Sequence, residues 1–213
     1  MLPRPFNLVS AGLPDLAADD PVILLRRWLE EAAKVAAEDY NAMVLATASP
    51  AGAPSARVVL CKGIELRPPA VVFYTNYESR KGRELETNPR AAGVFYWSSL
   101  KRQARIEGTV VRTSEAESDE YFRSRPLLSR IGAIASRQSE PLPTRSTLAA
   151  RVVRTALQPG AAGRRPATWG GFRVFLDRIE LWAAGAGRLH DRVAWTRVLS
   201  SDPTVWTPTR LFP

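Results

Sequence analysis

The segment FYTNYESRKGRELETNP, residues 73–89, places two adjacent cations where a helix is expected to begin. Ser79 is a typical N-cap residue, so Arg80 and Lys81 would lie in the first helical turn. Cations are unfavourable there, because a helix N-terminus already carries free amide groups and the positive end of the dipole. A phosphate bound between them would remove that conflict. The segment therefore predicts an anion site, with a solvated basic turn as the alternative.

Tyr121 and Arg125 are four residues apart in a second predicted helix. That spacing places both side chains on one helical face, where they could contact one dianion together. An exposed helix surface is the more common explanation for such a pair. The spacing alone therefore does not identify a ligand.

His190 is the single histidine of the chain and lies between Arg188 and Arg192 in the stretch GRLHDR. Metal centres usually draw on several histidine, cysteine or carboxylate ligands, so a lone histidine argues against a metal site. We therefore predict no bound metal. On this stretch alone, a structural histidine in a turn is the favoured interpretation.

The composition is that of a globular protein with one hydrophobic core. A chain of 213 residues with 45% hydrophobic and 24% charged residues is long enough to fold as one domain. We expect residues 1–20 to form an N-terminal segment and residues 21–213 to form that domain. No apolar run reaches membrane-spanning length, no signal peptide is recognised, and the one cysteine, Cys61, rules out an intrachain disulfide. These features predict a cytoplasmic protein without a membrane partner.

The net charge of +9 raises the question of nucleic acid as a partner. The basic residues are mostly arginines, however, and they are scattered rather than gathered in one run. Many lie beside serine, threonine, glutamine or tyrosine. That pattern suits small phosphate ligands bound bidentately, and it equally suits a solvated surface. We therefore predict no nucleic-acid partner.

The hydrophobic pattern predicts an antiparallel barrel decorated by helices, since it contains many strands of similar length and few helical segments. A helix is expected over residues 21–38, and a second runs from Ser114 to Pro126, where Ser114 and Glu117 have capping-box spacing. The other expected elements are strands over 42–48, 56–62, 70–75, 91–97 and 103–112, an irregular helical region over 127–157, a connector over 158–168, and strands over 173–183 and 192–199.

Seven motifs occur in the order and approximate spacing of one known family. They are RVVLCK, FYTNYESRKGRE, RQARIEG, YFRSRPLLSRIGA, SRQSE, WGGFRV and RLHDR, and the closing RLFP follows the same pattern. From about residue 20 to residue 213 the chain resembles the pyridoxamine 5′-phosphate oxidase family. The resemblance implies a mainly β fold with helices (α+β), an FMN-binding split β-barrel that forms a homodimer. It also implies two flavin sites at the subunit interface, each built from both chains.

The resemblance assigns cofactor-binding roles to residues of several motifs. Those expected around FMN are Arg57, Val58, Lys62, Tyr74, Thr75, Arg80, Lys81 and, from the long strand, Gln103. Those expected to complete the flavin pocket from the other subunit are Gln138, Ser139, Trp182 and Arg192. For Arg80 and Lys81 this agrees with the anion site that the residues themselves indicate. For Gln103 and Trp182 only the resemblance indicates a role.

The substrate side follows from the same resemblance. The family's phosphate cradle corresponds here to Lys62, Tyr121, Arg125 and Ser129, which implies a phosphorylated substrate. Arg188 and His190 are the implied catalytic residues, because the R-L-H segment stands over the flavin on the substrate side. The implied reaction oxidises pyridoxamine 5′-phosphate or pyridoxine 5′-phosphate to pyridoxal 5′-phosphate, with dioxygen as the electron acceptor. His190 is then expected to be functional.

One departure from the family pattern keeps alternatives open. Family members commonly carry a basic segment before the first helix that folds over the substrate, whereas Arg4 is the only cation there in this chain. Whether residues 7–20 act as a lid stays open, as does the preference between amine and alcohol substrates. One alternative is a flavin oxidase of the same fold that acts on a secondary-metabolite ring, such as a reduced phenazine precursor. The other is a non-enzymatic flavin- or nucleic-acid-binding module, against which the retained Arg188 and His190 count.

Overall fold

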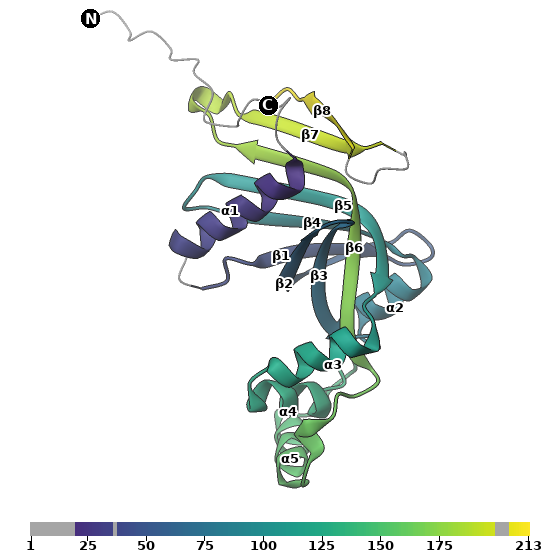
Figure 1. Ribbon diagram of the computed structural model, residues 1–213. Helices are drawn as coiled ribbons and strands as arrows, with labels where there is room; N and C mark the ends of the chain where they lie inside the picture. Colours follow the sequence, from purple (N-terminus) through teal and green to yellow (C-terminus); the bar gives the residue numbers. More distant parts are fainter. Residues whose placement is uncertain (1–19, 36–37, 199–204) are drawn as a thin grey trace, which may run out of the picture.

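The computed structural model describes residues 20–35, 38–198 and 205–213. Its strands are β1 Ala42–Ala48, β2 Pro54–Leu66, β3 Pro69–Asn76, β4 Arg90–Trp97, β5 Arg102–Arg112, β6 Trp169–Ala183, β7 Asp191–Arg197 and β8 Trp206–Arg210. They form one antiparallel sheet in the order β3-β2-β1-β4-β5-β6-β7-β8. Because β3 also pairs with β6, the first six strands of this order close into a barrel (Figure 1).

Strand β6 closes the barrel through its first half. There it pairs with β3, from Asn76 opposite Trp169 to Ala70 opposite Phe175. The other edge of this half of β6 pairs with the end of β5, where Arg112 lies opposite Phe172 and Thr109 opposite Phe175. This half of β6 therefore has a hydrogen-bonded neighbour on both sides. The barrel is thereby left without a free edge at this point, which is the usual reason for closing a sheet.

The start of β6 was not predicted from the sequence, because it contains two adjacent glycines. We expected this strand to begin at residue 173, whereas it begins at Trp169. Glycine is depleted in strands, so the pair Gly170 and Gly171 reads as a loop. A Cβ atom on Gly170 would stand 2.0 Å from the hydroxyl oxygen of Tyr77. Tyr77 therefore packs in the space that any larger residue at this position would fill.

Helix α1 (Pro21–Val35) packs its apolar face on the barrel. Leu25, Trp28 and Ala32 are buried, as their helical spacing indicates. Trp28 contacts Trp97 edge to face, with ring centroids 6.3 Å apart. This contact joins the helix to the apolar cluster inside the barrel.

Three helices between β5 and β6 form an arm that projects from the barrel (Figure 1). They are α3 Glu115–Ser124, α4 Leu127–Ala135 and α5 Arg145–Leu157. The predicted capping box is confirmed, because the Ser114 hydroxyl accepts from the Glu117 amide (3.2 Å) and the Glu117 carboxylate accepts from the Ser114 amide (2.8 Å). The irregular helical region resolves into α4 and α5. Pro141 and Pro143 lie between these two helices and cannot continue either one.

The predicted α+β split barrel is confirmed by this architecture. Several expectations fall outside the described residues: the N-terminal segment 1–20 apart from Asp20, its role as a lid, and positions 36–37 of the first helix. The carboxylate of Asp20 accepts a hydrogen bond of 2.8 Å from the Val22 amide, as expected of a helix cap. That residues 21–213 form a single domain stays a prediction.

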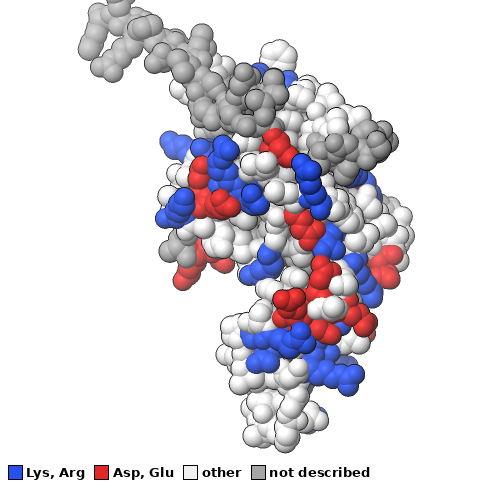
Figure 2. Space-filling view, in the orientation of Figure 1, with Lys and Arg blue, Asp and Glu red and all other residues white. Residues whose placement is uncertain are grey.

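The surface carries both signs of charge. On the face drawn in Figure 2, lysine and arginine side chains are interspersed with aspartate and glutamate, without one continuous basic area among the described residues. In the described part of the chain no helix is long and apolar enough to cross a membrane. The same residues contain no group of three or more histidine, cysteine, aspartate or glutamate side chains that could hold a metal ion.

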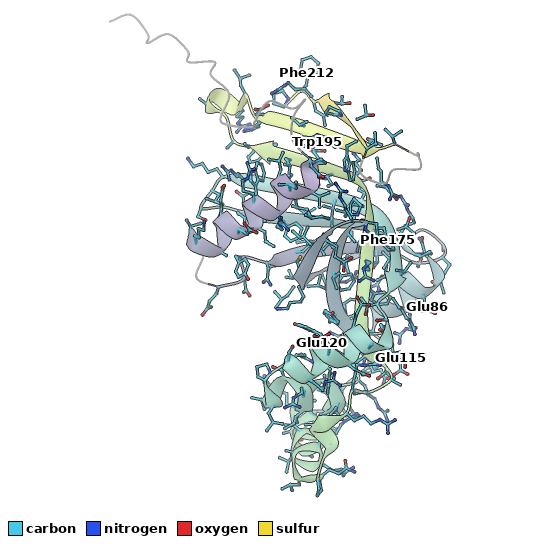
Figure 3. The ribbon with its side chains drawn as sticks, in the orientation of Figure 1. Glu86, Glu115, Glu120, Phe175, Trp195 and Phe212 are labelled. Carbon is cyan, nitrogen blue, oxygen red and sulfur yellow. The ribbon has the colours of Figure 1, made fainter. Side chains whose placement is uncertain are left out.

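Strands β7 and β8 extend the sheet beyond the barrel along the second half of β6. Trp195 of β7 is 1% exposed and belongs to the apolar cluster, so the extension shares the core of the barrel. Phe212, which follows β8, is 94% exposed (Figure 3). The extension therefore has a firmly packed inner face and a free outer end.

Candidate active site

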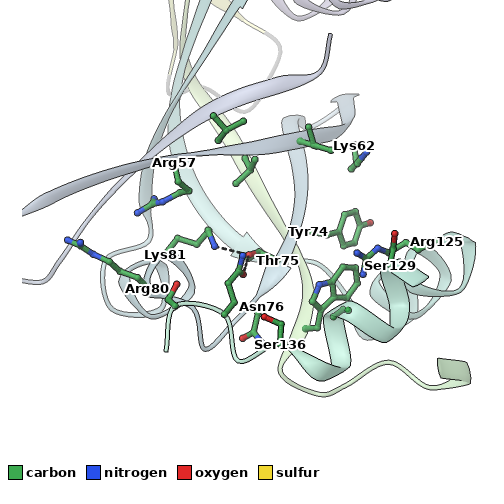
Figure 4. Close-up of a pocket in the computed structure, with 18 of the residues that line it drawn as sticks. Arg57, Lys62, Tyr74, Thr75, Asn76, Arg80, Lys81, Arg125, Ser129 and Ser136 are labelled. Atoms are coloured by element: carbon green, nitrogen blue, oxygen red, sulfur yellow. Dashed lines mark hydrogen bonds between the residues drawn. The ribbon is translucent and has the colours of Figure 1, made fainter. Parts of the chain in front are cut away.

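A cavity of about 830 Å³ lies where β2 and β3 meet the helical arm. Helix α2 (Arg80–Thr87) begins at one side of it, and α4 with its following loop forms the other side (Figure 4). The predicted site residues that line it are Arg57, Val58, Lys62, Tyr74, Thr75, Arg80, Lys81, Tyr121, Arg125, Ser129, Gln138 and Ser139. One chain therefore brings most of the predicted site together.

The start of α2 presents a buried, uncompensated cation to this cavity. Ser79 caps the helix as expected, because its hydroxyl accepts from the Gly82 amide (3.3 Å). Lys81 is only 6% exposed, and its ammonium donates to the hydroxyls of Thr75 and Ser79 at 3.1 Å each. No carboxylate pairs with it among the residues that the structure describes. Burial, and then the charge of Arg57, lower the pKa of Lys81 to about 8.

A buried carboxylate connects two other cations of this end. Glu84, on α2, accepts from the Arg80 guanidinium at 2.9 Å and from the Arg57 guanidinium at 3.3 Å. The hydroxyls of Thr47 and Ser55 also donate to Glu84, at 2.5 and 2.6 Å. Burial by itself raises the pKa of Glu84, but the hydrogen bonds outweigh burial and lower that pKa to about 2. Glu84 was not among the predicted site residues, although its position four residues after Arg80 is the spacing of a helical ion pair.

The opposite end of the cavity is an aromatic stack beside a second group of cations. Tyr74 and Tyr121 stack with ring centroids 3.9 Å apart, and Trp169 lies 5.7 Å from Tyr74. The Arg125 guanidinium lies 4.6 Å from the centre of the Trp169 ring, in cation–π geometry. One of its terminal nitrogens, Nη1, is buried without a hydrogen-bond partner among the described residues. A buried guanidinium nitrogen in that state is a ready donor for an anion.

Figure 4 shows how the cations, together with Ser129, divide between the two ends of the cavity. Arg57, Arg80 and Lys81 lie on one side of Thr75, while Lys62, Arg125 and Ser129 lie on the side of Tyr74. The two groups lie on opposite sides of a single cavity. A ligand or pair of ligands with two separate anionic groups would fit this distribution.

The local structure at Arg125 differs from the sequence-based expectation. Helix α3 ends at Ser124, and Arg125 is its C-cap, with φ −73° and ψ 148°. Tyr121 and Arg125 therefore do not share a helical face, because the chain turns away just before Pro126, a residue that disfavours helical backbone at the preceding position. Both side chains nevertheless line the cavity.

Gln138 and Ser139 also lie differently from the expectation that they act from the other subunit. The loop after α4 turns at Ser139, whose φ of 73° is left-handed, and it returns towards β3 of its own chain. The Thr75 hydroxyl donates to the side-chain oxygen of Gln138 at 3.1 Å. Both residues therefore line the cavity of the chain to which they belong.

Three further predicted residues form a row on the sheet, away from the cavity lining. Gln103 of β5 is the cross-strand partner of Trp182 of β6, and Trp182 is the partner of Arg192 of β7. Directly paired residues of an antiparallel sheet point to the same face, so these side chains stand side by side. The carboxylate of Glu180, 4% exposed, accepts from Arg192 at 2.8 and 3.2 Å and fixes its guanidinium.

Arg188 and His190 lie in the turn that follows β6, beside this row. The His190 ring centroid is 4.7 Å from that of Trp182, and its Nδ1 accepts from the Gly185 amide at 3.2 Å. With Nδ1 as an acceptor, Nε2 carries the proton of the neutral ring and can donate. Arg188 is exposed and has a φ of 65°, a left-handed backbone that non-glycine residues rarely adopt. A second cluster, defined here as Gln103, Trp182, Arg188, His190 and Arg192, is thus assembled on one chain but outside its cavity.

The closed six-stranded antiparallel barrel places the chain among the flavin-binding split barrels, and its cationic cavity lies at the start of α2. The profile described as pyridoxamine 5′-phosphate oxidase matches residues 29–158. The profile described as the pyridoxine 5′-phosphate oxidase C-terminal dimerisation region matches residues 169–213. The chain therefore belongs to the pyridoxamine 5′-phosphate oxidase family, a family of oxidoreductases.

Individual relatives agree with this assignment. The chain is 50% identical over 207 residues to a pyridoxine/pyridoxamine 5′-phosphate oxidase of Rubrobacter xylanophilus, covering 95% of this chain and 92% of that protein. It is 50% identical over 208 residues to the enzyme of the same name from Burkholderia ambifaria, with coverages of 97% and 96%. A solved structure, PhzG from Burkholderia lata in complex with tetrahydrophenazine-1-carboxylic acid, is 32% identical with a TM-score of 0.84, covering 96% of this chain and 99% of that one.

Proposed function

We propose that the protein oxidises pyridoxamine 5′-phosphate or pyridoxine 5′-phosphate to pyridoxal 5′-phosphate, with FMN as cofactor and dioxygen as electron acceptor. With the amine, the substrate, dioxygen and water give pyridoxal 5′-phosphate, ammonia and hydrogen peroxide. With the alcohol, no water is consumed and no ammonia forms. The names of the half-identical relatives support the substrate class.

The observation that carries the proposal is the presence of two unsatisfied cationic ends in one cavity. Buried Lys81, which has no carboxylate partner among the described residues, suits the phosphate of FMN, together with Arg57 and Arg80. At the other end, the buried and unpartnered nitrogen of Arg125 suits a second phosphate. FMN and a phosphorylated substrate would supply one phosphate each. The residues present therefore fit the cofactor.

The second phosphate would be held by Lys62, Tyr121, Arg125 and Ser129, which share one end of the cavity. When bound, FMN supplies the two-electron redox chemistry, and the chain contributes orientation and electrostatics. Holding the substrate by its phosphate places its reacting carbon in a fixed position, which lowers the entropic cost of reaction. Phosphate binding at this end is therefore proposed to act in positioning as well as in affinity.

The second cluster is proposed to complete the site from a partner chain in a homodimer. Gln103 is paired with Tyr96, and Tyr96 and Val94 are two positions apart on β4, so both point to the same sheet face. Val94 is paired with Val44, and Val44 with Val58, a residue 63% exposed that also lines the cavity. One sheet face thus carries exposed apolar residues and joins the cavity to the second cluster. A second copy seated on this face would bring its cluster to the cavity.

Arg188 and His190 are proposed to act on the substrate from that partner chain. The guanidinium of Arg188 can stabilise negative charge that develops on the substrate's oxygen or nitrogen. Nε2 of His190 can donate a hydrogen bond that orients the substrate, since Nδ1 is held by Gly185. The profile of the dimerisation region, 169–213, contains both residues.

A second candidate is an oxidase that acts on a reduced phenazine-type ring. It is favoured by the likeness to PhzG, whose structure contains tetrahydrophenazine-1-carboxylic acid. The anionic group of that ligand is a carboxylate, whereas the anionic group of the phosphorylated B6 compounds is a phosphate. The two candidates therefore differ in whether the Arg125 end of the cavity must hold a phosphate dianion.

The deciding experiment incubates the FMN-loaded protein with pyridoxamine 5′-phosphate and follows formation of pyridoxal 5′-phosphate and hydrogen peroxide. Parallel reactions contain pyridoxamine without its phosphate and a dihydrophenazine carboxylate. Turnover that depends on the phosphate supports the proposal. Equal turnover of pyridoxamine with and without phosphate defeats it, and preferred turnover of the phenazine compound favours the second candidate.

Replacing Arg80 with alanine is expected to weaken FMN binding without unfolding the protein. The variant loses one charge-assisted contact to phosphate, which is worth about 1.5–3 kcal/mol. That corresponds to a roughly tenfold to hundredfold higher dissociation constant. Titration of the apo-protein with FMN, followed by flavin fluorescence, measures it. An unchanged dissociation constant would exclude a phosphate role for Arg80, and circular dichroism checks the fold.

The affinity for FMN should fall as the pH rises above about 8, because Lys81 loses its proton there. Phosphate beside the ammonium raises the pKa of Lys81 in the complex, so the complex binds more protons than the free protein. The full affinity is then present below pH 8 and is lost as the pH rises towards the higher pKa of the complex. Dissociation constants for FMN and riboflavin between pH 7 and 9 measure this effect. The decline should be absent for riboflavin and for Lys81→Met, and a decline of equal slope in that variant would contradict the assignment to Lys81.

A further inference from the structure

We propose that Glu84 is a positioning residue that holds Arg57 and Arg80 in the orientation that binds the cofactor phosphate. This inference rests on the proposed function, because it takes the α2 end of the cavity as the FMN phosphate site. Glu84 itself is not among the residues that line the cavity, and it acts through the two arginines.

The contacts of Arg57 show how this orientation is fixed. One terminal nitrogen, Nη1, donates to the Thr47 hydroxyl at 2.6 Å, and the other, Nη2, donates to the Ser55 hydroxyl. Each of these hydroxyls in turn donates its own hydrogen to Oε2 of Glu84, at 2.5 and 2.6 Å. Oε2 also accepts a direct hydrogen bond of 3.3 Å from Nη2 of Arg57. One carboxylate oxygen therefore orients both hydroxyls so that their lone pairs face Arg57.

The other oxygen of the carboxylate holds Arg80. Oε1 of Glu84 accepts from Nε of Arg80 at 2.9 Å, which leaves the terminal nitrogens of Arg80 unengaged by this contact. The Arg80 side chain is 62% exposed, and an exposed arginine loses rotamer entropy when it binds a ligand. An anchor at Nε reduces that loss before the ligand arrives. This is preorganisation of a flexible cation.

Glu84 is buried, and removing its carboxylate from water is unfavourable unless other groups stabilise the charge. Its side chain is 8% exposed, and a buried carboxylate is stable only when hydrogen-bonded and paired. Both oxygens satisfy that condition through groups on β1, β2 and α2. Glu84 also tethers α2 to the barrel, so a purely structural role would lower stability without a loss of affinity specific to FMN.

A role through charge and a role through positioning predict opposite effects of replacing Glu84 on FMN affinity. Arg57, Arg80, Lys81 and Glu84 together carry a net charge of +2 when all are ionised, which matches a phosphate dianion at neutral pH. Replacing Glu84 with glutamine raises this net charge by one unit. If Glu84 mattered only through its charge, FMN would bind more tightly. If Glu84 positions the arginines, FMN binds more weakly in spite of the added positive charge.

The test measures the dissociation constants of FMN and riboflavin for wild type and Glu84→Gln. We expect a roughly tenfold weaker FMN affinity in the variant, comparable with partial loss of a charge-assisted hydrogen bond. Riboflavin affinity should be nearly unchanged, because riboflavin has no phosphate. Tighter or unchanged FMN binding would overturn the proposal, and so would an equal loss for both flavins, which indicates a structural role.

Glu86→Gln is the matched control, since it makes the same substitution two residues further along α2. Glu86 lies on the outer side of the helix, with a side chain 58% exposed and paired with Arg112 at 2.7 Å (Figure 3). Its replacement changes the protein's charge by the same amount and should leave FMN affinity as in wild type. In the Arg80→Ala background the effect of Glu84→Gln should shrink, because only Arg57 remains to be positioned. An undiminished effect there would count against the link to Arg80.

If Glu84→Gln does not fold, Glu84→Asp decides the question. Aspartate keeps the charge but withdraws the carboxylate by one methylene group. If Glu84 positions the arginines, Glu84→Asp should bind FMN more weakly. If only its charge matters, the FMN affinity should be unchanged. Wild-type affinity in Glu84→Asp would overturn the proposal. The proposed function is tested separately by the wild-type protein. If wild type binds FMN no better than riboflavin, it has no phosphate site at α2, whatever the affinities of the variants.

Discussion

Replacing Arg188 with alanine should lower kcat for pyridoxamine 5′-phosphate by about a hundredfold to a thousandfold, the range found when one preorganised electrostatic contact to a transition state is removed. Arg188 is exposed on its own chain, in a turn outside the cavity, so its proposed partner is the substrate of the neighbouring subunit. Because alanine keeps a Cβ atom, the left-handed backbone at this position stays equally strained in the variant. The comparison therefore isolates the guanidinium.

Steady-state kinetics and an FMN titration on the same preparation measure this prediction. We expect kcat and kcat/KM to fall together, since the lost interaction belongs to the transition state, and the FMN dissociation constant to stay nearly unchanged. A loss of FMN affinity comparable with the loss of kcat would place Arg188 on the cofactor. A kcat within a few-fold of wild type would remove it from the catalytic residues.

Replacing Arg125 with alanine should mainly raise KM for pyridoxamine 5′-phosphate, by about tenfold to a hundredfold. The guanidinium lies over the Trp169 ring, and its buried Nη1 lacks a partner among the described residues, so phosphate is its proposed acceptor. This contact exists before and during the reaction. Its loss should weaken binding more than it slows the chemical step.

The dephosphorylated substrate provides the control for Arg125. Turnover of pyridoxamine is expected to be poor in wild type and nearly the same in Arg125→Ala, because neither combination contains the phosphate contact. If Arg125→Ala impaired both substrates equally, the residue would act through the Trp169 stack instead of through phosphate. If the natural substrate carries no phosphate, Arg125→Ala should scarcely affect its oxidation, whereas Arg188→Ala should still impair it.

The sequence was most informative where local chemistry decides local structure. Ser79 as a cap of α2 and Ser114 with Glu117 as a capping box are both confirmed, because side-chain hydrogen bonds at a helix start involve neighbours in the chain. The strand 42–48 was also predicted with its observed bounds, since it is a short apolar run that ends at the turn residues SPAGAP. The antiparallel barrel was indicated by the many strands of similar length, and the family by the order of the motifs.

Non-local contacts could not be read from the sequence. Glu84 of helix α2 contacts Thr47 on β1 and Ser55 on β2, and no pattern in the chain links these three residues. Trp169 stands in a recognised motif, yet its contact with Arg125 depends on how the arm folds back on β6. The sequence also could not tell that the predicted site residues divide into a cavity and a second cluster. That division follows from strand pairing, which brings Gln103, Trp182 and Arg192 side by side on β5, β6 and β7, whereas the cavity is lined by β2, β3 and the helical arm.

The closure of the barrel by β3 and β6 has a consequence for the order of events during synthesis. Phe73 pairs with Phe172, so the segment between them must leave the ribosome before these two strands can meet. Pairing of segments far apart in the chain is slow, since loop closure precedes any gain from contacts. Until Trp169 and its neighbours emerge, the nascent chain exposes the unpaired edge of β3, a template for association with other chains. The cavity wall at Tyr74, which pairs with Gly171, is therefore among the last parts of the molecule to fold.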